Sequence, residues 1–495
     1  MFQSDAVLTS RSNLIMHAND GGESGSVVWF KRPEYIVIAL IGILYIALIG
    51  RYNAFDLDSR WFPSFSRSFW LEHIETDTFM RQAFPDGMGG VIAFGKLAGF
   101  IQGGLLSVFG WSLTAAALIS TAFILLSLLL LARTCQYLGY GTNFTFCFIA
   151  FLGLTEPFVA ASQRARYEFL PVFMLALALW LAARKNIVLS MFVAALATEV
   201  EPAAVVIAFA VATFLFSLNT QSKALRPPAL IVRILLGAAA AVTVFFLLHP
   251  HIISVFRSAD WGALDKGNIR VPGGFVAAYY IVYRRHLPEL ALLLAAIIRC
   301  IIGNKKNLLL QWPALCGAVI FVLATILRWP NSAYFVFIAP FLCLFVMQAF
   351  YADKYRNWIL AAILLFTLPQ YAYRYKWSSL QYAALSQHDE NKVNAAITRA
   401  AARVGKSPEQ LNIIGNYALW FAHPHLFVNL NTGIVNQNML RSADLLLCFD
   451  RRIDPAAHTN QEIPCADLDQ IDYRLAETMS IHGRQLQLRI PTHQP

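Results

Sequence analysis

Long apolar stretches with short polar connections dominate this chain between residues 35 and 372. Each is close to the roughly 17–25 mainly apolar residues that cross a bilayer as a helix. About eleven can be drawn, at 35–50, 112–132, 143–161, 168–183, 187–200, 203–218, 230–248, 288–302, 308–327, 331–350 and 357–372. The pattern predicts a polytopic α-helical membrane protein.

One apolar segment departs from that pattern. Residues 89–110 are apolar but rich in glycine, and they contain Lys96 and Gln102. We expect a re-entrant or interface-lying pair of helices here rather than a full span.

The tail from about residue 373 has a different character. KVNAAITRAAARVGKSPEQL predicts one amphipathic helix that stops near Gly405. LNIIGNYALWF, HLFVNLN, LLLCFD and RQLQLRI predict short strands separated by turns. We expect a small α/β or α+β domain without a nucleotide-binding glycine motif. The predicted organisation is a cytoplasmic segment 1–34, a transmembrane domain 35–372 with an external loop 51–111, and an extracytoplasmic domain 373–495.

Composition and charge support a membrane location and set its orientation. The chain is 57% hydrophobic and 14% charged, too apolar for a soluble globular protein. Lys31 and Arg32 precede the first span, which lacks a signal-peptide cleavage site, so we place the N-terminus in the cytoplasm. An odd number of spans then puts the tail outside. The predicted location is the inner (cytoplasmic) membrane, crossed many times.

An acid-bearing stretch, residues 55–87, follows the first span on the predicted outer face, beside several aromatic residues. Its acids are Asp56, Asp58, Glu72, Glu75, Asp77 and Asp86. The same face receives arginines that topology does not require, namely Arg164, Arg166, Arg257, Arg270, Arg284 and Arg285. Arginine suits bidentate capture of phosphate, and the net charge of +10 also favours an anionic ligand. The alternative is headgroup anchoring or pairing with local carboxylates.

The cysteines and histidines carry less chemistry. Cys448 and Cys465 alone fall in the tail, and we predict that they form a disulfide if the tail faces an oxidising compartment. No Cys/His spacing resembles a zinc site. Two His-Pro-His sequences, at 249–251 and 423–425, are interpreted as loops.

Four segments, taken in order, resemble the GT-C superfamily of integral membrane glycosyltransferases, of the lipid-carrier-dependent mannosyl/aminoarabinose-transferase type. HIETDTFMR is similar to the acidic motif of that family's first external loop, and ASQRARYEFLPVFMLALALWLAARK to the stretch in which an external Arg and Glu begin the fourth span. ALATEVEPAAVVIA is similar to the turn that follows, and RWPNSAYFVFIAPFL to a late helix that opens with Tyr and contains Pro. The chain departs from the family in having E-T-D instead of adjacent acids, Tyr167 where Pro is common, and Glu201 where His or Lys is common.

The resemblance implies an inverting transfer of sugar from a polyprenyl-phosphate carrier to an acceptor on the outer face. Asp77 is our candidate base, with Glu75 as the alternative. Asp56 and Asp58 are a possible divalent-metal pair, although we prefer a turn and surface ion pair with Arg60 and Pro63. The candidates for binding donor phosphate or substrate are Arg164, Arg166, Glu168, Glu201, Arg257 and Tyr334.

The expected partners are a polyprenyl-phosphate-linked sugar donor, a glycan, lipid or protein acceptor, and membrane lipids, with no nucleic acid and no certain cofactor. Arg166 and Glu168 have the alternative of simply pairing with each other, and Glu199 and Glu201 that of binding a structural partner such as Arg164. A polytopic transporter, or a ligase or flippase of lipid-linked glycans, is the alternative function. The first should show internal repeats and mid-membrane charges.

Overall fold

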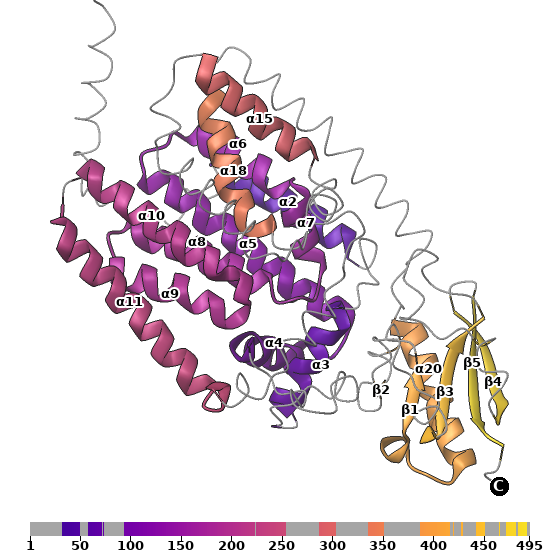
Figure 1. The fold of residues 1–495 in the computed structure, drawn as a ribbon. Coiled ribbons are helices and arrows are strands. Elements are labelled where there is room, and N and C mark those ends of the chain that lie inside the picture. The colour runs from indigo at the N-terminus through magenta and orange to yellow at the C-terminus, as the bar shows by residue number, and fades with distance from the viewer. Residues whose placement is uncertain are drawn as a thin grey trace, which may run out of the picture.

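The computed structural model describes a helical part followed by a small sheet with one helix (Figure 1). The described residues are 32–49, 58–71, 73, 94–222, 224–253, 287–302, 335–350, 387–415, 419, 427–428, 442–450, 465, 472–481 and 484–492. The predicted spans at 308–327 and 357–372 lie outside these ranges.

Helices form the described residues up to 350, and most coincide with the predicted apolar stretches. They are α2 (Pro33–Leu48), α3 (Asp58–Leu71), α4 (Lys96–Phe109), α5 (Leu113–Tyr137), α6 (Thr142–Gly153), α7 (Glu156–Gln163), α8 (Phe169–Ala183), α9 (Ile187–Val200), η2 (Pro202–Ala204), α10 (Val205–Ser222), α11 (Pro227–Leu248), α15 (Leu287–Ile302) and α18 (Phe335–Phe350). The longest, α5, begins at Ser112, whose hydroxyl accepts a hydrogen bond from the Ala115 amide at 3.1 Å. Proline opens α2 and α11, where its missing N–H has no helical partner to lose.

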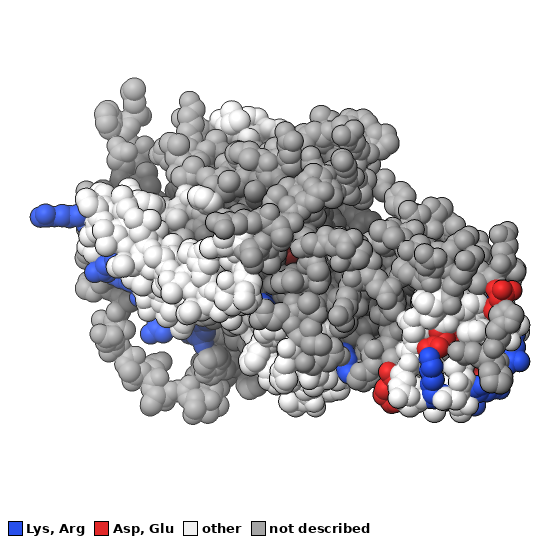
Figure 2. Space-filling model, turned by 60° about the horizontal axis from the view of Figure 1, so that its bottom comes forward, with Lys and Arg blue, Asp and Glu red and all other residues white. Residues whose placement is uncertain are grey.

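Several of these helices have the length and surface of membrane spans. Among the described residues, three helices are long and apolar enough to cross a bilayer, Leu113–Tyr137, Pro202–Thr220 and Pro227–Leu248. Large apolar side chains are exposed along α2 at Ile36, Leu40 and Ile43, one helical face. The helical surface in Figure 2 shows mostly neutral side chains, whereas the C-terminal part has charges of both signs. Apolar faces turned outward are those of a membrane protein.

The third predicted span, 143–161, is broken in the structure. It consists of α6 and α7, which meet at an angle of 61°. The break falls at Leu154 and Thr155, and Pro157, near the start of α7, has no N–H to continue the helical hydrogen bonding. Every residue of α7 is buried. The pair counts as one bent span or as a re-entrant turn.

The segment 89–110 provides one helix among the described residues, α4, which packs against α3. The two helices approach closely at Gly103, where an added Cβ would lie 2.6 Å from Trp70 Cβ and 2.8 Å from the Ser66 carbonyl oxygen. Glycine therefore allows the two backbones to touch.

The tail forms a five-stranded mixed sheet with helix α20 (Gln387–Val404) against β4 and β5. The strands are β1 (Ile413–Gly415), β2 (Phe427–Val428), β3 (Leu445–Phe449), β4 (Tyr473–Ile481) and β5 (Arg484–Pro491), in the order β2-β1-β3-β5-β4. β1 runs parallel to β2 and β3, and β5 runs antiparallel to β3 and β4. The amphipathic helix is confirmed, since Val393, Ala396, Ile397 and Ala400 are buried and Gly405 follows with φ of 72°.

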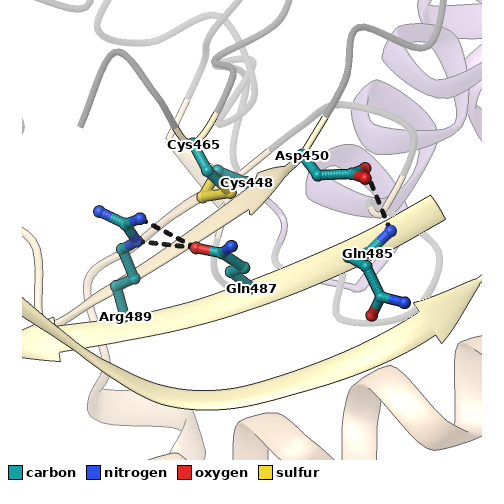
Figure 3. Close-up of a disulfide and its surroundings, with 6 residues drawn as sticks. All are labelled: Cys448, Asp450, Cys465, Gln485, Gln487 and Arg489. Atoms are coloured by element: carbon teal, nitrogen blue, oxygen red, sulfur yellow. Dashed lines mark hydrogen bonds between the residues drawn. A yellow bond between two sulfur atoms is a disulfide. The ribbon is translucent and has the colours of Figure 1, made fainter. Parts of the chain in front are cut away.

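The predicted disulfide is also confirmed (Figure 3). Cys448 and Cys465 are bonded, with their Cα atoms 5.1 Å apart. Cys448 lies in β3 opposite Gln487 of β5, so the bridge ties residue 465 to the middle of the sheet. Beside it, the Asp450 carboxylate accepts a hydrogen bond from the backbone N–H of Gln485 at 3.1 Å.

Candidate functional site

Part of the predicted site lies outside the described residues, namely Asp56, Glu75, Asp77, Arg257 and Tyr334. Asp58 begins helix α3, although its side chain is not described. The turn that we expected around Asp58, Arg60 and Pro63 is wrong, because all three belong to α3. Packing of the buried face of α3 on α4 outweighs the helical hydrogen bond that Pro63 cannot make.

The described centre of the site is the arginine turn, residues 163–168, which joins α7 to α8. Arg166 and Glu168 form an ion pair, Nε to Oε1, at 2.5 Å, and their side chains are only 7% and 5% exposed. The Arg166 guanidinium also lies over the Phe62 ring of α3, 5.5 Å from its centroid. The two neighbours pair with each other, as our alternative interpretation held. The attraction between two charges buried this deeply offsets the free-energy cost of removing them from water only when their geometry is fixed.

Side chains from several helices fix the backbone of the arginine turn. The Thr121 hydroxyl donates a hydrogen bond to the Ser162 carbonyl just before the turn at 2.9 Å. Within the turn, the Ser120 hydroxyl donates to the Arg164 carbonyl at 2.7 Å, and the Gln102 side-chain amide donates to the Ala165 carbonyl at 3.0 Å. In return, the Gln163 amide donates to the Tyr45 carbonyl of α2 at 3.0 Å. The turn is therefore held from α2, α4 and α5 together, and its conformation is set before any ligand arrives.

Tyr167 ties the same turn to α3. Its hydroxyl lies 2.8 Å from Ser66 Oγ and 3.1 Å from the Phe62 carbonyl oxygen, and its ring meets Phe62 edge-on with centroids 4.5 Å apart. Ser66 Oγ in turn donates to Gln102 Oε1 at 2.7 Å. Neither Tyr167 nor Gln102 was predicted to have these roles, since both depend on contacts between segments far apart in the sequence.

A second buried cluster lies where α4 begins and where α9 and α11 end. Glu199 accepts a hydrogen bond from the Leu97 amide at 3.3 Å and contacts His249 Nε2 at 2.9 Å. Both side chains are almost fully buried. Lys96 donates to the Leu248 carbonyl oxygen at 2.7 Å. Glu199 therefore has a structural partner, as one of our alternatives held, and its partner is His249.

His249 is a residue whose role the sequence analysis missed. It follows α11 directly, within a His-Pro-His sequence interpreted only as a loop. A histidine at the end of an apolar span, with an acid at the end of another, was the available signal. Glu201 is also buried, directly after α9.

The described residues contain no group of three or more His, Cys, Asp or Glu side chains arranged to hold a metal ion. Within the described ranges, the buried side-chain oxygens Gln163 Oε1, Glu34 Oε2 and Gln348 Oε1 have no hydrogen-bond partner. Gln163 Oε1 belongs to the arginine turn, and it can accept a hydrogen bond from a substrate hydroxyl.

The chain as a whole is similar to a solved structure. No family model matches the chain, and no curated protein matches it. The crystal structure of ArnT from Cupriavidus metallidurans, bound to undecaprenyl phosphate, is similar at 12% sequence identity with a TM-score of 0.44. The match covers 94% of this chain and 98% of that one.

Proposed function

We propose that this protein is an inverting membrane glycosyltransferase that moves a sugar from a polyprenyl-phosphate carrier to an acceptor on the outer face of the cytoplasmic membrane. The observation that carries the proposal is the buried Arg166–Glu168 pair on a turn held by four helices. A fixed, desolvated guanidinium within an apolar helical bundle suits the phosphate of a lipid-borne donor. The motif order of the sequence supports the same class.

The proposed reaction is a single displacement. The acceptor oxygen attacks the anomeric carbon while the bond from that carbon to the carrier phosphate breaks, and the phosphate departs with the bonding electrons. Asp77 takes the acceptor's proton, with Glu75 as the alternative base. Arg166, with Arg164 beside it, compensates the charge that grows on the leaving phosphate. Glu168 orients Arg166 through Nε.

Glu201, Arg257 and Tyr334 are proposed to complete the substrate site, and Asp56 with Asp58 remains a possible metal pair. The acceptor is a glycan, a lipid or a protein. The Cys448–Cys465 disulfide supports an extracytoplasmic position for the proposed domain 373–495, because such bonds persist in oxidising compartments.

Sugar transfer by the purified protein tests the proposal. The substrates are synthetic polyprenyl-phosphate sugars, and the products are transferred sugar and free polyprenyl phosphate. Asp77→Asn should lower kcat on the order of 10²–10⁴-fold if Asp77 is the base. Absence of transfer from every donor by folded wild-type protein would overturn the proposal, and movement of an intact lipid-linked glycan would favour a transporter or flippase.

The role of Arg166 can be tested against a matched control, Arg133, in the same chain. Arg166→Lys removes the planar fork and should raise the KM for donor about tenfold or more. Arg133 lies over the Tyr35 ring at 5.4 Å, much as Arg166 lies over Phe62. Arg133 is near the opposite end of α5 from Ser120, so Arg133→Lys should leave the KM unchanged. Equal effects of the two substitutions would remove Arg166 from the donor site.

Topology provides an independent test. Single cysteines at position 77 and in the C-terminal domain should react with a membrane-impermeant thiol reagent added outside the cell. Labelling of position 77 only after the membrane is opened would place it in the cytoplasm and contradict the outer-face reaction.

A further inference from the structure

A closed chain of hydrogen bonds links the arginine turn to α3 and α4. The Tyr167 hydroxyl can donate to Ser66 Oγ at 2.8 Å, Ser66 donates to Gln102 Oε1 at 2.7 Å, and the Gln102 amide donates to the Ala165 carbonyl at 3.0 Å. This series of hydrogen bonds starts at Tyr167 of the turn and ends at Ala165, two residues earlier in the same turn. Ser66 and Gln102 are fully buried and Tyr167 is 2% exposed, so water does not compete for these bonds.

Helix α4 is shaped around this tyrosine. An added Cβ at Gly95 would lie 3.0 Å from the Tyr167 ring, and one at Gly99 would lie 3.2 Å from its hydroxyl. Gly95 also has φ of 81°, which favours glycine. The two glycines, one turn apart, let the helix approach the ring. Tyr167 thus occupies a place that both α3 and α4 accommodate.

The contact reaches Arg166 through Phe62. The Tyr167 ring meets the Phe62 ring edge-on, and the Phe62 ring is the surface under the Arg166 guanidinium. Since Glu168 fixes Arg166 on the turn and Phe62 belongs to α3, a shift of α3 relative to the turn would change what surrounds the guanidinium. Asp77 stands in the sequence between α3 and α4, the two helices that Tyr167 holds.

We infer that Tyr167 is a positioning residue, which fixes α3 and α4 against the Arg166–Glu168 pair and so sets the surroundings of the phosphate-binding arginine. This inference rests on the proposed function. Tyr167 stands where the resembled family commonly has proline. The tyrosine hydroxyl makes the hydrogen bond to Ser66 that a proline could not make.

The first test is kinetic. Tyr167→Phe keeps the ring and removes the hydroxyl, and it should lower kcat per folded protein on the order of 10–10²-fold. Ser66→Ala interrupts the same chain, so the double variant should be no slower than the slower single variant. Tyr140→Phe is the control, because it removes a half-buried tyrosine hydroxyl, one bonded to Gln348 beyond the far end of α5. It should leave kcat unchanged. An unchanged kcat in Tyr167→Phe, or additive effects in the double variant, would overturn the inference.

The second test does not require turnover. Nitroxide labels at the exposed positions Leu71 of α3 and Leu118 of α5, in protein lacking its free cysteines, report the distance between these helices. Tyr167→Phe should broaden or shift the distance distribution, and Tyr140→Phe should not. If wild-type protein transfers no sugar, the proposed function fails, while the label distances still decide whether Tyr167 holds α3. An unchanged distribution would show that it does not.

Discussion

Two adjacent glycines in α4 should respond in opposite ways to the same substitution. Gly103 and Gly104 both lie inside the helix, but they face different surroundings. A Cβ at Gly103 would lie 2.6 Å from Trp70 Cβ and 2.8 Å from the Ser66 carbonyl oxygen, atoms that cannot swing away. A Cβ at Gly104 would lie 3.4 Å from the edge of the Trp70 ring, an ordinary van der Waals distance.

The magnitudes decide the sign at each position. Alanine in place of glycine inside a helix lowers the free energy of the folded state by about 0.5–1 kcal/mol. Overpacking a close contact costs about 1–3 kcal/mol. At Gly104 only the first effect operates, so Gly104→Ala should stabilise the protein by up to about 1 kcal/mol. At Gly103 the second effect dominates, and Gly103→Ala should destabilise it by roughly 1–2 kcal/mol.

Unfolding of the intact protein in one detergent, followed by tryptophan fluorescence against added denaturant, measures both changes. Trp70 lies at the contact, so its signal should shift in folded Gly103→Ala and remain native in Gly104→Ala. Two stability changes of the same sign would refute the close packing of α3 on α4.

Two further predictions concern the C-terminal part. Replacing both Cys448 and Cys465 by serine opens a loop with a sequence separation of 17 residues and should cost about 2–4 kcal/mol of unfolding free energy. Reductant should then no longer affect the unfolding midpoint, and a continued effect would contradict the assignment. A hydrogen bond from Arg399 lowers the pKa of the Glu477 carboxyl from its ordinary 4.5. Stability from this pair is present above pH about 4.5 and is lost as pH falls through the lowered pKa. Glu477→Gln should remove that acid-range loss, and equally steep pH curves would count against it.

Patterns within a single segment were predictable from the sequence. The helical period of residues 392–404 located α20, and alternating or continuous apolar runs located β3 and β5. Two tail cysteines allowed only one pairing within the tail. The pairing of the sequence neighbours Arg166 and Glu168 was recognised as an alternative to their preferred role at the donor phosphate.

Contacts between distant segments were not predictable. The bonds from Tyr167 to Ser66 and from Glu199 to His249 span 101 and 50 residues, and no local preference encodes them. Pro63 suggested a turn, since local rules count its lost hydrogen bond but not the packing of α3 on α4. The bend between α6 and α7 was missed, although Glu156 and Pro157 at the start of α7 were local signals for it.

The strand order also constrains the sequence of events in which the C-terminal part folds during synthesis. β5 comes last of the five strands in the sequence, yet it stands between β3 and β4. During synthesis β4 has no described partner until β5 is complete, whereas Cys448 and Cys465 are both available earlier. Oxidation can therefore precede completion of the sheet, and a premature stop before residue 484 would leave the bridge possible but β4 without its neighbour.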